Sequence, residues 1–256
     1  MTEEIKQELS KLEELHRIKI LYAVESGSRA WGFASTDSDW DVRFIYVHHP
    51  DWYLSIETHK DNIEFILPND IDLSGWELKK TLNLFRKSNP PLLEWLRSPI
   101  VYKQQFDTAS WMREAGTQFF SAKSCMYHYL HMAQGNLEAY FKTDEVRLKK
   151  YFYVLRPILA CSWIERTGEM APMEFDTLLN FEPLSVELRK AIDELLERKK
   201  SGDELKTGSR IAVIDTFIEE KIAHLRSYLQ QYPAESQLDI ELLNSIFRNT
   251  LKQAWN

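Results

Sequence analysis

The sequence has little cysteine and no long apolar run. Only two of its 256 residues are cysteines, Cys125 and Cys161. Both stand in apolar, helix-like surroundings typical of small core residues, so neither a disulfide framework nor a cysteine-rich metal site is expected. No apolar run reaches transmembrane length, and the N-terminal MTEEIKQELSKLEEL lacks the apolar core of a signal peptide. We therefore expect a cytoplasmic protein.

An excess of positive charge is also missing. Asp and Glu number 39 against 32 Lys and Arg, which gives a formal net charge of −7. This balance argues against bulk electrostatic attraction to nucleic acid, so a nucleic-acid contact is expected only in a local groove. The hydrophobic content of 44% supports a packed core, and the eight Trp, eleven Tyr and thirteen Phe suit either a core or base stacking.

Several common site signatures are absent as well. The segment GSRAWG does not end in the Gly-Lys-Ser/Thr of a phosphate-binding P-loop. An EF-hand beginning at Asp37 would need glycine where Val42 stands and glutamate where His48 stands. No Ser-His-Asp or Cys-His arrangement emerges. These absences exclude P-loop, calcium-loop and hydrolase-triad interpretations.

Apolar spacing predicts an N-terminal α/β part and a mainly helical remainder. A helix is expected over 3–16 and strands over 18–24, 42–47, 63–67 and 70–73. Further helices are expected over 76–87, 92–97, 107–119, 121–141, 145–166, 185–200, 206–230 and 238–254, with an irregular stretch at 169–183. The predicted fold class is α+β, with a catalytic domain over 1–105 and a helical domain over 106–256.

The stretch from residue 25 to residue 47, ESGSRAWGFASTDSDWDVRFIYV, holds the strongest candidate site. Asp39 and Asp41 alternate at the entrance to a predicted strand, so their carboxylates point the same way and can share hard cations. Gly27 lets backbone N–H groups approach an anion closely, and Ser28 adds a hydroxyl. These residues predict a site for a nucleoside triphosphate (NTP) with Mg²⁺ or Mn²⁺.

Two-metal nucleotidyl transfer places two cations about 4 Å apart to activate an attacking oxygen and to neutralise the leaving pyrophosphate. A third carboxylate on a neighbouring strand normally completes such a site. Asp72 is favoured, because it lies in a short apolar segment that can run beside the Asp39/Asp41 strand. Asp70 has the same strand parity, and Glu64 lies on another candidate strand, so the third ligand stays open among the three.

The pattern of these residues resembles that of a known superfamily. Gly27-Ser28 followed by Asp39-x-Asp41 is similar to the nucleotidyltransferases that include DNA polymerase β, the CCA-adding enzymes and the kanamycin nucleotidyltransferases. Three blocks within residues 18–165 resemble more closely the RlaP family of predicted nucleotidyltransferases, associated with RNA repair. The blocks are GSRAWGFASTDSDWDVRFIYV, DLSGWELKKTLNLFRKSNPPLLEWLRSPIVY and KKYFYVLRPILACSWI.

The resemblance implies a polymerase-β-like palm, a mixed sheet with flanking helices, followed by a helical C-terminal domain. It implies that Gly27 and Ser28 hold the nucleotide phosphates and that Asp39, Asp41 and Asp72 bind two metal ions. The implied reaction moves a nucleoside monophosphate from an NTP to an acceptor hydroxyl, with an RNA or tRNA end as acceptor. The alternatives are a protein or small-molecule acceptor, or a nucleotide- or RNA-binding protein without catalysis.

Further cationic and aromatic side chains are candidates for nucleotide contacts. Lys149, Tyr153 and Arg156 recur at i, i+4 and i+7, hence on one face of a predicted helix, where they could bind a triphosphate and stack a base. The alternative is a solvated basic edge with Tyr153 half-buried. Arg29 could reach a phosphate or pair with a carboxylate. Arg43 shares strand parity with the aspartates, so an ion pair to one of them competes with a substrate contact.

Overall fold

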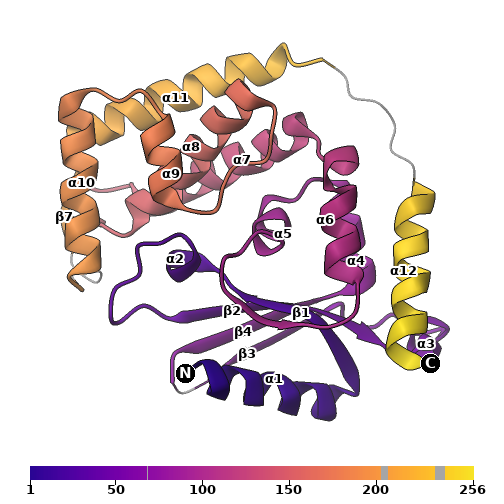
Figure 1. The fold of residues 1–256 in the computed structure, drawn as a ribbon. Coiled ribbons are helices and arrows are strands. Elements are labelled where there is room, and N and C mark those ends of the chain that lie inside the picture. Colours follow the sequence, from indigo (N-terminus) through magenta and orange to yellow (C-terminus); the bar gives the residue numbers. More distant parts are fainter. Residues whose placement is uncertain (68, 203–206, 234–239) are drawn as a thin grey trace. The chain divides into compact units, whose positions relative to one another are not determined.

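The computed structural model describes residues 1–67, 69–202, 207–233 and 240–256 (Figure 1). The chain divides into two compact units. The sheet unit comprises residues 1–30, 39–120 and 236–256, and the helical unit comprises residues 31–38 and 121–235. A five-stranded mixed sheet with flanking helices and the helical region that follows it confirm the predicted α+β class.

The sheet unit holds all five strands of the large sheet. They are β1 (Ile18–Glu25), β2 (Trp40–His48), β3 (Asn62–Ile66), β4 (Ile71–Glu77) and β5 (Val101–Gln104). The strand order is β3-β4-β2-β1-β5, with β2 and β4 parallel and the other neighbours antiparallel. The helices of this unit are α1 (Thr2–His16), α2 (Gly27–Ala30), α3 (Pro50–Tyr53), α4 (Leu78–Arg86), α5 (Pro90–Trp95), α6 (Thr108–Phe119) and α12 (Ile240–Trp255).

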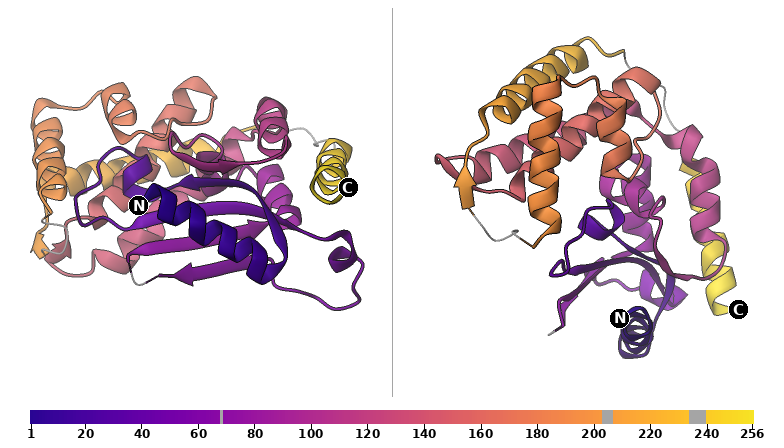
Figure 2. Two further views of the ribbon diagram at one scale, coloured as in Figure 1. Left: turned by 60° about the horizontal axis from the view of Figure 1, so that its bottom comes forward. Right: turned by 60° about the vertical axis from the view of Figure 1, so that its left-hand side comes forward.

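Helix α1 covers one face of the sheet, and α4, α5 and α6 lie on the other side (Figures 1 and 2). The apolar stripe of α1 packs on alternate residues of the strands, as the period of two requires. The buried cluster so formed contains Ile5, Leu9, Leu12, Ile18, Ile20, Ala23, Val42, Phe44, Tyr46, Ile71, Leu73 and Tyr102. The residues that alternate with these members on β2 and β4, including Asp41 and Asp72, therefore face away from α1.

Strand β4 continues further than the sequence predicts. Its register pairs Gly75 with Phe44 of β2, and a Cβ atom on Gly75 would lie 2.1 Å from a ring carbon of Phe44. The glycine therefore leaves room for the ring. Glu77 ends the strand and caps α4, because its carboxylate accepts hydrogen bonds from the backbone N–H groups of Lys79 at 2.7 Å and Lys80 at 3.1 Å. Helix α4 therefore begins at Leu78, two residues after the predicted start.

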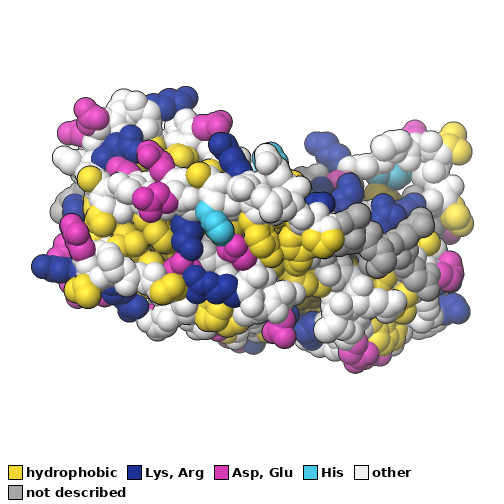
Figure 3. All heavy atoms as spheres, turned by 90° about the horizontal axis from the view of Figure 1, so that it is seen from above, with side chains coloured by type: hydrophobic (Ala, Val, Ile, Leu, Met, Phe, Trp, Pro, Cys, Tyr) yellow, Lys and Arg dark blue, Asp and Glu magenta, His cyan; other side chains and the backbone are white. Residues whose placement is uncertain are grey.

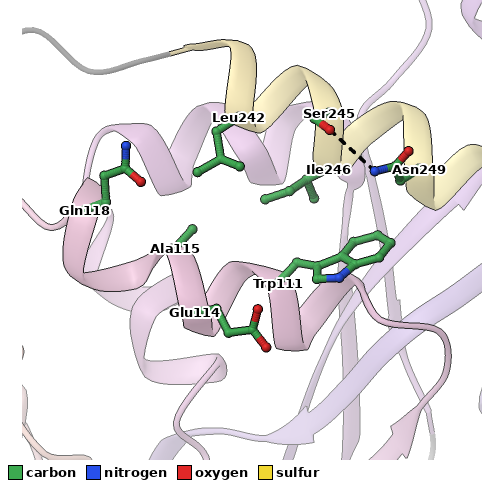
Figure 4. Close-up of a pocket in the computed structure, with 8 residues that line it drawn as sticks. All are labelled: Trp111, Glu114, Ala115, Gln118, Leu242, Ser245, Ile246 and Asn249. Atoms are coloured by element: carbon green, nitrogen blue, oxygen red, sulfur yellow. Dashed lines mark hydrogen bonds between the residues drawn. The ribbon is translucent and has the colours of Figure 1, made fainter.

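Helices α6 and α12, both expected in the helical domain over 106–256, belong to the sheet unit. Helix α12 contacts α4 and α6, and the Thr108 and Thr250 hydroxyls are 2.7 Å apart in a buried hydrogen bond. A groove of about 380 Å³ lies between α6 and α12, and Trp111 of α6 and Ile246 of α12 are among the residues that line it (Figure 4). No Lys or Arg stands among the described residues that line it. The compact units thus divide the chain differently from the expected boundary after residue 105.

The helical unit is built around two long, packed helices, α7 (Ala122–Tyr140) and α8 (Lys150–Thr167). Its other elements are β6 (Glu145–Arg147), α9 (Phe175–Phe181), α10 (Val186–Lys200), β7 (Thr207–Ser209) and α11 (Ala212–Gln230). Helix α9 occupies the stretch expected to be irregular. The expected helix starts at 206 and 238 lie outside the described residues. Each helix within the described residues is too short or too polar to cross a bilayer.

Segment 31–38 connects α2, which begins with the Gly-Ser turn (Gly27 and Ser28), to Asp39. This segment is part of the helical unit. The backbone oxygen of Trp31 accepts a hydrogen bond from the Phe175 N–H at 3.0 Å. The Phe33 ring lies 4.8 Å from the Phe152 ring and 5.4 Å from the Phe175 ring, centroid to centroid. Aromatic packing of this kind anchors the middle of the segment among α8 and α9.

Candidate active site

The turn after β1 brings the backbone against the carboxylate of Asp41. The Ser26 N–H donates to the Asp41 backbone oxygen at 2.8 Å, and Gly27 follows with a φ of 59°. A Cβ atom on Gly27 would lie only 2.0 Å from Oδ2 of Asp41. Glycine is therefore required here both for its left-handed conformation and for the space that it leaves. Ser28, in the single turn of α2, is half-buried.

Asp41 and Asp72 lie side by side on neighbouring parallel strands. The register pairs Asp41 of β2 directly with Asp72 of β4. Both side chains point to the face opposite α1, with 28% of the Asp41 side chain and 38% of the Asp72 side chain exposed. Two partly buried carboxylates so arranged form an acidic site open to solvent.

Arg43 lies between these two carboxylates. One guanidinium nitrogen, Nη2, is 2.9 Å from Oδ1 of Asp41 and 2.8 Å from Oδ2 of Asp72. The other, Nη1, donates to the backbone oxygens of Asp72 at 3.0 Å and Val42 at 3.2 Å. Arg43 thus makes the ion pair that strand parity allowed, and it does so with both acids at once.

Asp39 lies just before β2 and is exposed. Its backbone oxygen accepts a hydrogen bond from Nε of Arg29 at 3.1 Å, and the Arg29 guanidinium stacks 3.8 Å from the ring centroid of Trp40. Arg29 is therefore packed beside the entrance to β2, next to the candidate metal ligand Asp39. Its predicted phosphate contact stays a prediction.

The two rivals of Asp72 occupy different positions. Asp70 precedes β4 with a φ of 59°, and its backbone oxygen accepts a hydrogen bond from the Trp40 N–H at 2.8 Å. Glu64 is exposed on the edge strand β3, opposite Ser74 rather than Asp72. Only Asp72 of the three is paired in register with Asp41, which favours Asp72 as the third ligand.

The electrostatics of Asp41 reflect this crowding of acids. Burial raises the pKa of the Asp41 carboxyl above its ordinary value, and the charges of Asp72 and Asp39 add to that rise while Arg43 opposes it. In the part of the chain that the structure describes, no three His, Cys, Asp or Glu side chains converge as a metal-binding cluster. The guanidinium of Arg43 stands between two of the expected ligands, Asp41 and Asp72.

Comparison with known proteins identifies the family. A family model described as "RlaP: RNA repair pathway DNA polymerase beta family" matches residues 1–249. The chain is also 49% identical over 255 residues to the uncharacterized protein YcgL of Bacillus subtilis (strain 168), covering 100% of this chain and 98% of that protein. The chain belongs to the RlaP family. Membership makes it a polymerase-β-like nucleotidyltransferase, as the sequence pattern predicts.

A solved structure is also similar to this RlaP chain. It is the crystal structure of a nucleotidyltransferase-like protein from Exiguobacterium sibiricum 255-15. The two chains are 10% identical with a TM-score of 0.33, and the match covers 98% of this chain and 81% of the other.

A buried acid, Glu25, lies behind the site of this RlaP chain, and the sequence pattern did not predict it. Glu25, at the end of β1, is 0% exposed and accepts hydrogen bonds from the Asp41 N–H at 2.9 Å and from the Tyr102 hydroxyl. Its backbone oxygen accepts a hydrogen bond from the Ser98 hydroxyl at 2.6 Å. Glu25 therefore ties β1, β2 and β5 together immediately behind Asp41. The only signal in the sequence is an acid directly after the apolar run 20–24.

The stability of the chain should depend on pH through Glu25. Burial raises the pKa of the Glu25 carboxyl, although hydrogen bonds from Tyr102 and from the Asp41 N–H oppose the rise. The folded state then holds the proton more tightly than the unfolded state, whose pKa is about 4.3. The stabilisation from the protonated acid is present below that pH and is lost as the pH rises through the folded pKa.

Glu25→Gln imitates the protonated acid, so its free energy of unfolding should rise relative to wild type as the pH increases from about 4 to 7. Urea denaturation of both proteins across this range measures the difference. Glu57→Gln, a change at an exposed position of the same unit, should give a flat difference. A Glu25→Gln difference that is flat or falls with pH would contradict the burial argument.

The predicted basic face of the RlaP helical unit is only partly exposed. Lys149 immediately precedes α8 and is half-buried, and the Tyr153 ring lies 6.3 Å from the Trp31 ring, centroid to centroid. Arg156 is 2% exposed, with its guanidinium 4.7 Å from the Trp31 ring centroid and Nη2 donating to the Met173 oxygen at 3.2 Å. A nucleotide contact from Arg156 would require this packing to open.

Proposed function

We propose that this chain is a metal-dependent nucleotidyltransferase that moves a nucleoside monophosphate from an NTP to an acceptor hydroxyl at an RNA end. One observation carries the proposal. Asp41 and Asp72 stand in register on parallel strands, with the Gly27 backbone packed against Asp41, in a chain that belongs to a DNA polymerase β family. Adjacent carboxylates beside a close backbone turn suit a metal-bound triphosphate.

The side chains of the site fit divalent cations. Asp39, Asp41 and Asp72 offer hard carboxylate oxygens, and the Arg43 guanidinium already bridges two of them, so the space between them suits positive charge. Asp39 and Asp41 would hold both ions, and Asp72 would hold the one beside the acceptor. Bound Mg²⁺ or Mn²⁺ supplies charge neutralisation of the triphosphate and activation of the attacking oxygen.

The nucleotide would bind mainly through the turn after β1. The backbone N–H groups that follow Gly27 and the Ser28 hydroxyl are donors for phosphate oxygens. Arg29 adds positive charge beside them. Lys149, Tyr153 and Arg156 of the helical unit stay predicted nucleotide contacts, and Arg156 could serve only after leaving its buried position.

The proposed reaction is an in-line displacement at the α-phosphorus. A bond forms between the acceptor oxygen and the α-phosphorus, the bond to the bridging oxygen of the β-phosphate breaks, and pyrophosphate leaves with that electron pair. The Asp72 carboxylate accepts the proton of the acceptor hydroxyl. The Glu25 carboxylate, which accepts a hydrogen bond from the Asp41 N–H, would hold this end of β2 in place throughout.

An RNA end as acceptor is supported by the family description rather than by surface charge. On the face drawn in Figure 3, Lys and Arg side chains are interspersed with Asp, Glu and hydrophobic side chains. The net charge of −7 agrees with this mixture. A short contact at the acceptor end is therefore proposed, with a weak dependence on salt.

A nucleotide- or RNA-binding protein without catalysis is the second candidate. The observation that favours it is Arg43, because a guanidinium that permanently neutralises Asp41 and Asp72 would make a metal ion unnecessary. Such a protein would bind NTP without transferring any part of it. Transfer of label therefore separates the two functions.

The test is transfer of label from α-³²P NTPs with Mg²⁺ or Mn²⁺, using RNA and tRNA, a protein pool and small hydroxyl compounds as separate acceptors. Label should move to RNA or tRNA, and EDTA should abolish the transfer. Asp72→Asn should remove activity, whereas Asp70→Asn and Glu64→Gln should keep most of it, because only Asp72 is paired in register with Asp41.

Three results would count against the proposal. Transfer that is unaffected by Asp39→Ala and Asp41→Ala would reject the site. Label found only on protein or on a small compound would reject RNA as the acceptor. NTP binding without transfer to any acceptor would favour the non-catalytic candidate.

A further inference from the structure

Arg43 occupies the position that a cation shared by Asp41 and Asp72 would take. Its Nη2 lies 2.9 Å and 2.8 Å from the two carboxylates, and only 18% of its side chain is exposed. These are short, charge-assisted contacts of a kind that forms when both partners are ionised. The guanidinium therefore acts as a counter-cation to the pair of acids.

The strands themselves put the guanidinium there. Arg43 follows Asp41 by two residues on β2, so both side chains lie on the same face. Its register partner on β4 is Ser74, a small residue two positions after Asp72 and on the same face of the sheet. The long arginine side chain can therefore turn back between the two carboxylates without a competing bulky neighbour.

The guanidinium makes two sets of contacts. Nη2 faces the carboxylates, whereas Nη1 donates to the backbone oxygens of Asp72 and Val42. The guanidinium is a rigid plane, so turning it away from the carboxylates breaks the first set of contacts and also shifts the second, while the Arg43 backbone stays paired in the sheet. The carboxylate contacts are thus the part that an incoming divalent cation would replace.

We propose that Arg43 is an internal competitor of the metal, which holds Asp41 and Asp72 together in the metal-free protein and must release both carboxylates before a divalent cation can bind them. This inference rests on the proposed metal-dependent function. Arg43 would then weaken metal binding, because a cation must break two charge-assisted contacts and bind beside a displaced positive charge. In return, it keeps the two acids from repelling each other while the site is metal-free.

The test is Mn²⁺ binding to the full chain without nucleotide, followed by the electron paramagnetic resonance signal of free Mn²⁺. Arg43→Ala and Arg43→Gln should bind Mn²⁺ about tenfold more tightly than wild type, a change equivalent to about 1.4 kcal/mol. Gln keeps a donor for the backbone oxygens but carries no charge, so it serves if the alanine variant fails to fold. Arg86→Ala removes the same charge from an exposed position on α4 and should leave the affinity unchanged.

Thermal unfolding supplies a second readout that a merely structural arginine would not give. Without metal, both Arg43 variants should unfold at a lower temperature than wild type. Saturating Mn²⁺ should raise the unfolding temperature of these variants more than that of wild type, so the gap between them narrows. A purely structural role predicts the same gap with and without Mn²⁺.

Several outcomes decide the question. Equal or weaker Mn²⁺ affinity in folded Arg43→Gln would overturn the role of Arg43, and nucleotide transfer by wild type would then leave the proposed function standing. Equal tightening in Arg86→Ala would also overturn it, since net charge alone would explain the effect. Absence of Mn²⁺ binding in wild type and in every variant would reject the metal site together with the competition.

Discussion

Asp41→Asn is expected to slow nucleotide transfer by about three orders of magnitude while the chain stays folded. A bound cation contributes several kcal/mol of transition-state stabilisation, and a loss of about 4 kcal/mol corresponds to roughly a thousandfold in rate. Asparagine has the same shape, so the hydrogen bond from the residue 41 N–H to Glu25 remains. Single-turnover label transfer at saturating NTP measures the rate, and circular dichroism checks the fold.

Asp51→Asn is the matched control. Asp51 is an aspartate of the same unit whose side chain is 86% exposed and contacts His49. This variant should transfer nucleotide at the wild-type rate. If Asp41→Asn kept more than about a tenth of the wild-type rate, a loss of less than about 1.4 kcal/mol, the carboxylate would not be a metal ligand.

Gly27→Ala should be nearly as damaging, for a steric reason. The added Cβ would lie 2.0 Å from Oδ2 of Asp41, so either the turn or the carboxylate must move. A displacement of about 1 Å in a catalytic group can cost roughly a hundredfold in rate. The φ of 59° adds a backbone cost of about 1–2 kcal/mol to the variant. Label transfer and urea denaturation measure the two effects separately.

Gly168→Ala separates the clash from the backbone cost. Gly168 has a φ of 70° at the end of α8, and a Cβ added there meets no atom within 4 Å. This variant should lose a similar amount of stability through its left-handed conformation and keep its transfer rate. Equal transfer rates in Gly27→Ala and Gly168→Ala would show that close approach of the turn to Asp41 is not needed.

Local patterns were sufficient where the chemistry lies in one short stretch. Alternation along β2 predicted that Asp41 and Arg43 share a face, and the apolar run behind them predicted the strand. The choice of Asp72 over its rivals needed the strand register, which depends on how β4 lies beside β2. Sequence spacing alone does not contain that register, so it leaves Asp72, Asp70 and Glu64 all open as the third ligand.

Contacts between residues that lie far apart in the sequence cannot be predicted from local patterns. Glu25 is buried by Tyr102, 77 residues away, and nothing local distinguishes it from an exposed acid at a strand end. Arg156 shares a helix face with Tyr153 as predicted, but Trp31 covers it from a segment 125 residues earlier. Helical spacing shows which side chains lie together and not which of them another segment covers.

Short elements were missed because their composition is not distinctive. Strand β5 has four residues and contains Lys103 and Gln104, so its pairing with β1 carries the assignment instead of alternation.

Helix α12 has the apolar spacing of an ordinary helix. Its place in the sheet unit depends on contacts with α4 and α6, which no periodicity reveals.

The course of segment 31–38 limits how this protein can be divided. The chain enters the helical unit after residue 30, returns to the sheet unit at Asp39, and leaves again after residue 120. The Gly-Ser turn and the first metal-ligand candidate are therefore the two ends of a loop whose middle is held by Phe152 and Phe175. Removing the helical unit would take Trp31 and Phe33 with it and break the connection between Ala30 and Asp39. An assay of the site therefore needs the whole chain.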